Sequence, residues 1–239
     1  MLKIVGDICL SDIYLDVGLG IGTKISNGLN PFAHLQKKED EIWIGNFESV
    51  VATQSIYQNY HKDFFRIEPS KLEKCKFIDY YGIANNHVME HGGVAYNQMR
   101  TFLQEFSKGA FGSEEQKTIV FNDSGKNISI TGFSLRREEG EEKPLYWNMP
   151  SLSEIKEEFD NIQSDFKIAY IHWGVEFINY PSTDQRRFAH WLIDLGFDII
   201  IGMHPHILQG YEIYKDKYIF YSIGNLIFNM SWERTKYSI

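Results

Sequence analysis

The segment from Ile199 to His206, IIIGMHPH, restricts the possible folds more than any other part of the chain. Three isoleucines run into Gly202, a pattern typical of a strand buried on both faces. The run ends at two histidines around Pro205, whose ring fixes its own φ and disfavours a helical conformation at His204. We therefore expect both imidazoles on rigid, extended backbone at a strand end. This pattern indicates either a metal site or two hydrogen-bonded core histidines.

Four other strand-like runs end in residues that can bind a metal. These runs are Leu2–Val5, Glu41–Ile44, Phe77–Ala84 and Lys167–Ile171. The candidate ligands that follow them are Asp7; Asn46 and Glu48; Asn86 and His87; and His172. Each has an ordinary explanation when taken alone, such as an aspartate that caps a turn. If the strands are parallel in a twisted sheet, however, their C-terminal ends meet at one crevice.

The expected ligands are carboxylates, amides and imidazoles. This mixture suits Mn, Fe or Zn better than an iron–sulfur cluster or Ca. The candidates outnumber the ligands that one ion needs, so we expect two divalent ions that share a bridging carboxylate. Such a pair lowers the pKa of a bound water and binds a phosphoryl oxygen.

Composition narrows the class of protein. The 239 residues are 43% hydrophobic, which is enough for one large core, and we expect a single domain over residues 1–239. The net charge of -8 argues against nucleic acid or anionic membrane as a partner. Lys3 and Asp7 interrupt any signal-peptide core, and no run is long enough for a membrane span. Cys9 and Cys75 lack disulfide-framework spacing. We expect a cytoplasmic chain, with any membrane association supplied by a partner.

Local patterns predict the remaining elements. Met99, Phe102, Leu103 and Phe106 share one helical face. Ser151 and Glu154 match a capping box before a helix. Further expectations are a helix from Thr183 to Leu195, a hairpin around residues 122–125, a short helix over 32–40, a loop over 17–31, a polar loop over 52–63 and a solvated charged loop from Arg136 to Lys143.

Six motifs follow one another along the chain: Gly6-Asp7, Gly45-Asn46-Phe47-Glu48, Ala84-Asn85-Asn86-His87, HWGVE from His172, HPHILQ from His204 and YSIGN from Tyr221. In this order they resemble the CapA-like family of bacterial capsule and poly-γ-glutamate synthesis proteins. The resemblance covers nearly the whole chain, and the last three motifs together are highly specific. It implies an α/β fold like that of calcineurin-type metallophosphoesterases, a four-layer αββα sandwich with two mixed β-sheets.

The resemblance also implies roles for the candidate residues. Asp7 and His206 would bind the first metal, and Asn86, His172 and His204 the second. Glu48 would bridge the two metals, with Asn46 as the alternative. His87 resembles the phosphoesterase histidine that protonates the leaving oxygen. Arg66, Glu176 and Arg186 are candidates for substrate contacts.

The chain departs from the related phosphoesterases in two motifs. Their first motif is Asp-x-His, whereas Cys9 stands two residues after Asp7 here. Cys9 is either a thiolate ligand or a buried packing residue. The second motif has Asn46-x-Glu48 in place of Gly-Asp. Both changes weaken the first metal site, so one tight and one labile ion is an alternative to two tight ions.

These observations support three hypotheses about function. The first is a metal-dependent phosphoesterase or phosphatase in capsule or other cell-surface polymer synthesis. It would act on a phosphorylated or polyanionic substrate beside capsule-synthesis proteins. The second is an amide hydrolase or transferase acting on a poly-γ-glutamate-type chain with the same metals. The third is a non-catalytic capsule-assembly subunit with a degenerate metal site.

Overall fold

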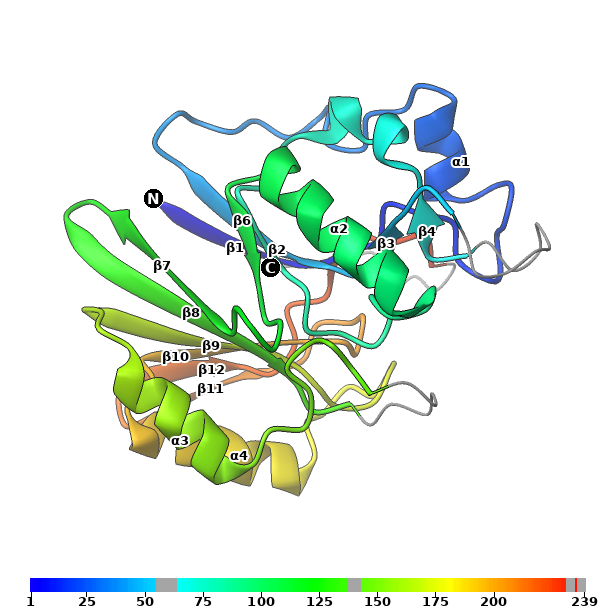
Figure 1. The fold of residues 1–239 in the computed structure, drawn as a ribbon. Coiled ribbons are helices and arrows are strands. Elements are labelled where there is room, and N and C mark those ends of the chain that lie inside the picture. Colours follow the sequence, from blue (N-terminus) through cyan, green and yellow to red (C-terminus); the bar gives the residue numbers. More distant parts are fainter. Residues whose placement is uncertain (55–63, 137–142, 231–234, 236–239) are drawn as a thin grey trace.

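Two β-sheets pack face to face in the computed structural model, which describes residues 1–54, 64–136, 143–230 and 235. Helix α2 (Gly92–Phe106) covers the outer side of one sheet, and helices α3 (Leu152–Asn161) and α4 (Thr183–Leu195) cover the outer side of the other (Figure 1). The four layers confirm the predicted αββα sandwich.

The first sheet has five strands in the order β13-β1-β2-β5-β6. Their bounds are β1 Leu2–Ile8, β2 Ile42–Phe47, β5 Tyr80–Gly82, β6 Gly109–Phe111 and β13 Asn225–Ile227. All neighbouring strands are parallel. The mixed pairing expected for both sheets is therefore absent from this one, because long connections rather than hairpins join its described strands. Parallel pairing places the C-terminal ends of these strands at one edge.

The second sheet is mixed, as predicted, with six strands in the order β11-β12-β10-β9-β8-β7. Their bounds are β7 Thr118–Asp123, β8 Lys126–Ser134, β9 Phe166–His172, β10 Ile199–Met203, β11 Tyr211–Tyr214 and β12 Lys217–Phe220. The four inner strands are parallel, and the edge strands pair through antiparallel hairpins. The hairpin predicted around residues 122–125 joins β7 to β8.

Apolar side chains from both sheets form the central core. Ile44 and Phe111 come from the first sheet, and Ile130 and Ile168 come from the second. The Tyr170 hydroxyl donates to the carbonyl of Val5 at 3.3 Å and so joins the sheets. The capping box before α3 is present as predicted, and α4 has the bounds expected from its sequence.

Short elements surround the first sheet. They are α1 (Ile21–Ser26), the parallel pair β3 (Val50–Val51) and β4 (Arg66–Ile67), and the 3-10 helices η2 (Pro69–Lys71) and η3 (Glu73–Cys75). The interval 17–31, expected to be a loop, contains α1, whose Thr23 backbone N–H donates to Asp12 at 2.8 Å. The polar loop expected over 52–63 and the charged loop of 136–143 fall largely outside the described residues.

The helix predicted over residues 32–40 is wrong. The backbone N–H of Phe32 donates to the Asn30 side chain at 2.9 Å, and the N–H of Ala33 donates to the Asn30 carbonyl at 3.1 Å. These bonds favour turns over a helix. In the part of the chain that is described, no helix has the length and apolar character needed to cross a membrane.

Candidate metal centre

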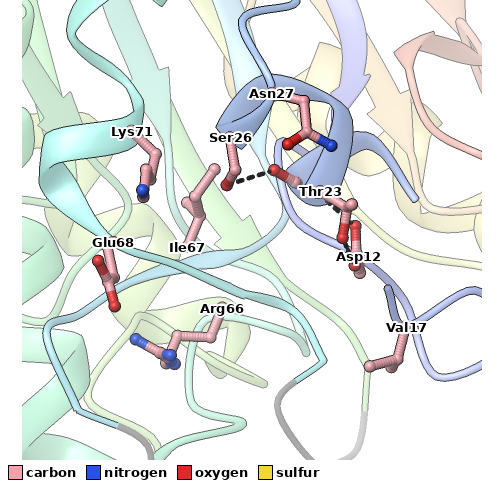
Figure 2. A pocket seen from close by; sticks show the side chains of 10 residues that line it. Asp12, Val17, Thr23, Ser26, Asn27, Arg66, Ile67, Glu68 and Lys71 are labelled. Carbon is pink, nitrogen blue, oxygen red and sulfur yellow. Dashed lines mark hydrogen bonds between the residues drawn. The ribbon is translucent and has the colours of Figure 1, made fainter. Parts of the chain in front are cut away.

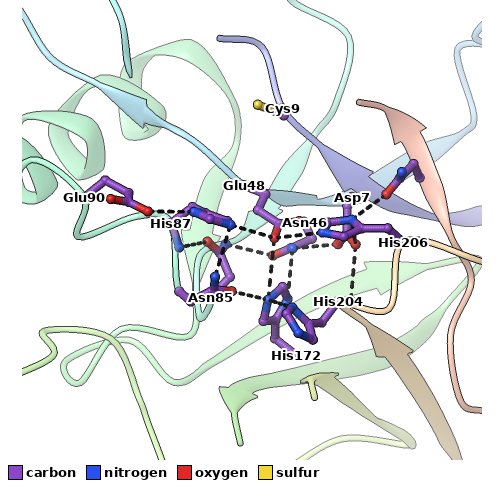
Figure 3. Close-up of polar contacts among 12 residues, drawn as sticks. Asp7, Cys9, Asn46, Glu48, Asn85, His87, Glu90, His172, His204 and His206 are labelled. Carbon is purple, nitrogen blue, oxygen red and sulfur yellow. Dashed lines mark hydrogen bonds and ion pairs between the residues drawn. The ribbon is translucent and has the colours of Figure 1, made fainter. Parts of the chain in front are cut away.

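The predicted metal ligands lie together where the strand ends of both sheets meet (Figure 3). Asp7 lies in β1 and Glu48 follows β2, while His172 ends β9 and both His204 and His206 follow β10. Among the described residues, three groups have potential ligand atoms within 4.8 Å of one another, and two of them are Glu48, His172 and His204; and Asp7, Glu48 and His206. Glu48 belongs to both groups, as a bridging ligand would.

Glu48 is fully buried, and neither of its carboxylate oxygens has a hydrogen-bond partner among the described residues. Its Oε1 lies 3.6 Å from His172 Nε2 and 3.9 Å from His206 Nε2. Burial raises the pKa of Glu48 well above its ordinary value, and the nearby Asp7 carboxylate raises it further. A buried carboxylate without a donor is unfavourable. The unsatisfied oxygens and surrounding imidazoles therefore fit divalent cations.

Asn46 supports the centre, and its contacts do not favour the bridging role offered as the alternative. Its Nδ2 donates to Asp7 Oδ1 at 2.8 Å, and its Oδ1 accepts from Asn85 Nδ2 at 3.1 Å. The β1–β2 register explains the first contact, because Asp7 pairs with Asn46. Both ends of the amide are thus engaged in positioning neighbouring side chains.

The group assigned to the second metal is compact. His172 Nε2 lies 2.8 Å from Asn86 Oδ1 and 3.1 Å from His204 Nδ1. Burial lowers the pKa of both histidines well below the ordinary value; neighbouring histidines lower that of His172 further, and the charge of Arg136 lowers both. The neutral imidazoles that result are the form that binds metal.

The group assigned to the first metal is anchored by Asn225, which the sequence analysis did not select. His206 Nδ1 donates to Asn225 Oδ1 at 2.9 Å and lies 3.4 Å from Asp7 Oδ2. Burial acts to lower the pKa of His206, but the adjacent Asp7 carboxylate outweighs burial and raises it. Asn225 is part of the YSIGN motif, which was the available signal.

The extended backbone predicted for the two histidines after β10 is wrong. His204 has φ +95° and His206 has φ +57°. Left-handed conformations cost non-glycine residues free energy and persist where the surroundings hold them. Here the His204 backbone N–H donates to Asp7 Oδ2 at 3.2 Å, and the contacts of His206 with Asp7 and Asn225 fix the second ring.

His87 lies beside the ligands with its ring held on three sides. Its Nδ1 donates to Glu90 Oε1 at 2.9 Å, and its Nε2 lies 3.1 Å from Asn86 Nδ2. The ring stacks on Phe65 with centroids 3.7 Å apart, and Nε2 lies 3.9 Å from Glu48 Oε1. The side chain is 14% exposed, so a substrate can reach it.

The three predicted substrate residues have different locations. Glu176 joins the centre, with a carboxylate oxygen within 4.8 Å of ligand nitrogens of His204 and His206. Arg66 donates to the carbonyl of Ala52 and lines a separate cavity of about 290 Å³, shown in Figure 2. Arg186 is 56% exposed on α4 and lies 3.5 Å from Glu212. The structure does not place the two arginines among the ligands, because each pairs within its own part of the surface.

Cys9 is buried and lies apart from the ligands in Figure 3. Its Sγ lies 3.3 Å from Ser11 Oγ, and it packs with Ile13 and Phe65. Burial raises the pKa of the thiol to about 12. These contacts favour the packing interpretation over a thiolate ligand.

Comparison with known proteins shows which family this chain belongs to. Residues 1–230 match the profile described as Bacterial capsule synthesis protein PGA_cap. The chain belongs to this family. The capsule biosynthesis protein CapA of Bacillus anthracis is 31% identical over 98% of this chain and 61% of its own length. The PGA biosynthesis protein CapA of Bacillus subtilis is 31% identical over 80% of this chain and 54% of its own length. This member of the PGA_cap family thus spans less than two thirds of either relative.

The fold of this PGA_cap family member is also seen in a phosphatase. The solved structure of a phosphatase from Mycoplasma pneumoniae has a TM-score of 0.54 and 16% sequence identity. The match covers 94% of this chain and 71% of the phosphatase. The fold expected from the motifs is therefore shared with a solved phosphatase. Since the identity is low, this likeness concerns the fold alone.

Proposed function

We propose that this chain is a divalent-metal-dependent hydrolase that cleaves a phosphoester bond during capsule or other cell-surface polymer synthesis. The observation that carries the proposal is Glu48, whose two buried oxygens lack hydrogen-bond partners among the described residues while imidazoles face one of them, Oε1. Membership of a capsule synthesis family and a fold shared with a phosphatase support the proposed context and chemistry.

The proposed ligands divide into two sets that share Glu48. Asp7 and His206 belong to one set, and Asn86, His172 and His204 to the other. Two Mn, Fe or Zn ions held there would lower the pKa of a bound water and neutralise charge on a phosphoryl group. Asn46 and Asn225 orient ligands through hydrogen bonds, which restricts the geometry that the site can offer.

His87 is the proposed general acid. His87 Nδ1 donates to Glu90. The opposite nitrogen of the ring, Nε2, points toward Glu48 and the other ligands. Protonated at Nε2, the imidazole can give its proton to the leaving oxygen, and the Glu90 carboxylate stabilises its positive charge. Phe65 stacking keeps the ring plane fixed while the proton moves.

The proposed substrate is a phosphorylated or polyanionic molecule, and the proposed partners are other capsule-synthesis proteins. The names of the relatives support this context. Metal charge at the centre would attract an anion despite the net charge of -8. A cytoplasmic location remains part of the proposal.

The chemistry of the relatives' polymer supports a second candidate function. One relative is a PGA biosynthesis protein, and the same ligands could polarise the carbonyl of a γ-glutamyl amide. A non-catalytic assembly role is the third possibility, because the first motif has Cys9 where a histidine ligand is usual.

One set of activity measurements separates these functions. Protein reloaded with Mn is assayed on p-nitrophenyl phosphate, bis(p-nitrophenyl) phosphate and a γ-glutamyl amide. The phosphoesterase proposal predicts metal-dependent turnover of a phosphoester. Turnover of only the amide would favour the second function. Absence of turnover on all three by protein that also cannot be reloaded would favour the assembly role.

A further inference from the structure

Arg136 lies two residues after the end of β8, next to the strand end that carries His172. Ser134, the last residue of β8, pairs with His172 in the sheet register. The backbone N–H of Leu135 donates to the His172 carbonyl at 2.9 Å, and that of Arg136 donates to Ser134 Oγ at 3.1 Å. The backbone of Arg136 is thus fixed beside a candidate metal ligand.

Only some of the N–H donors of the Arg136 guanidinium have hydrogen-bond partners among the described residues. Its Nη1 donates to the carbonyl of Gly174 at 3.2 Å, whereas Nε is buried without a hydrogen-bond partner among the described residues. The Gly174 carbonyl that it contacts lies two residues after His172, so the guanidinium lies near the ligands. Within the described ranges, no carboxylate forms an ion pair with it.

A half-buried guanidinium with an unsatisfied N–H is unfavourable unless an anion compensates it. Its planar array of donors matches the oxygens of phosphate or carboxylate groups. The loop that it contacts also carries Glu176, whose carboxylate approaches His204 and His206. An anionic substrate entering beside Glu176 needs a fixed cation there to offset the repulsion.

Anchoring of the Gly174 loop is the structural alternative for Arg136. Gly174 has φ +90°, and a Cβ there would lie 2.7 Å from Gln185 Nε2. The backbone conformation of Gly174 and its proximity to Gln185 already restrict this loop. An anchoring role also does not explain why Arg136 Nε is buried without a hydrogen-bond partner. The anchoring role predicts a change in stability without a change in anion affinity.

We infer that Arg136 binds an anionic oxygen of the substrate beside the candidate metal centre, with phosphate as the favoured group. The inference rests on the proposed phosphoesterase function for the identity of that group. The anion would accept from the terminal N–H groups of the Arg136 guanidinium that Gly174 does not occupy, while its other oxygens face the metal ligands. Arg136 is thereby a substrate-binding residue that the charged-loop interpretation of the sequence missed.

The test measures binding of inorganic phosphate to Mn-loaded protein by calorimetry, with metal content determined on the same samples. Arg136→Gln should retain its metal and bind phosphate about ten- to a hundredfold more weakly, the loss typical of a charge-assisted hydrogen bond. Arg100→Gln is the matched control, because Arg100 lies on α2 and already pairs with a carboxylate, that of Glu115 at 2.9 Å. It should bind phosphate like the wild type.

Glutarate, a dicarboxylate, serves as a second probe that separates this inference from the proposed function. If the wild type binds glutarate but not phosphate, and Arg136→Gln loses that binding, the anion role stands and the phosphoester proposal falls. Equal affinity of Arg136→Gln and wild type for the anion that the wild type binds would overturn the inference. Failure of the wild type to bind either anion would also overturn it.

Discussion

His172 Nε2 lies 3.1 Å from His204 Nδ1, although the two residues are 32 positions apart in the chain. Parallel pairing of β9 with β10 produces this approach, because Met203 pairs with His172 and His204 follows directly. Burial holds the pKa of both rings low, so two neutral imidazoles meet with Asn86 Oδ1 on the same side.

The lowered pKa of His172 predicts how the stability of metal-free protein depends on pH. The unfolded chain takes up a proton near pH 6.5, whereas folded His172 takes one up only at lower pH. The contribution of this residue to the free energy of unfolding therefore falls as pH drops below 6.5. Urea unfolding between pH 5 and 7 should show a shallower loss of stability for His172→Gln than for wild type. An unchanged slope would contradict the buried, neutral state.

His87→Ala should retain its metal and lose about 10²- to 10⁴-fold in kcat on a phosphoester with a poor leaving group. The loss should be much smaller for a good leaving group such as p-nitrophenolate, because that oxygen needs little protonation. Steady-state kinetics on both substrates, with metal analysis, check this. Equal losses for both leaving groups would remove His87 from the general-acid role.

Glu90→Gln should lower kcat by about tenfold while metal content stays unchanged, because it removes the charge that orients and stabilises protonated His87. Glu105→Gln, an exposed position on α2, is the control. A kcat equal to that of the wild type would show that the contact with Glu90 is only structural.

Gly202→Ala should destabilise the protein by roughly 1–3 kcal/mol or more through overpacking. A Cβ at Gly202 would lie 2.1 Å from the Tyr221 carbonyl oxygen and 2.3 Å from Trp173 Nε1. Gly210→Ala is the control, since a Cβ at Gly210 meets nothing within 4 Å. Urea unfolding should separate the two variants. Equal stabilities would contradict the close approach of β10 to residue 221.

Most of the candidate centre could be predicted from the sequence because its ligands occur at or near the ends of apolar runs. Parallel strands then bring Asp7, Glu48 and His172 together without further information. Asn225 and Arg136 could not be selected in this way. Their roles depend on which strands are neighbours and on the register between them.

The incorrect local predictions have similar physical causes. The proline rule describes steric contacts between neighbouring residues, so it could not anticipate that Asp7 holds His204 at φ +95°. The helix expected over residues 32–40 gives way to turns stabilised by Asn30. Arg66 and Arg186 were chosen for their charge alone, and their partners could be known only from the fold.

The most direct test of the central claim is the number of Mn ions bound per chain, measured by calorimetry and elemental analysis on wild type, Glu48→Gln and Glu41→Gln. Glu41 is the matched control because it is a buried carboxylate at the opposite end of β2, paired with Lys3 at 2.8 Å. We predict two ions for wild type and Glu41→Gln, and loss of one or both from Glu48→Gln. Equal metal binding by Glu48→Gln and wild type, or a wild type that binds no metal, would contradict a centre bridged by Glu48.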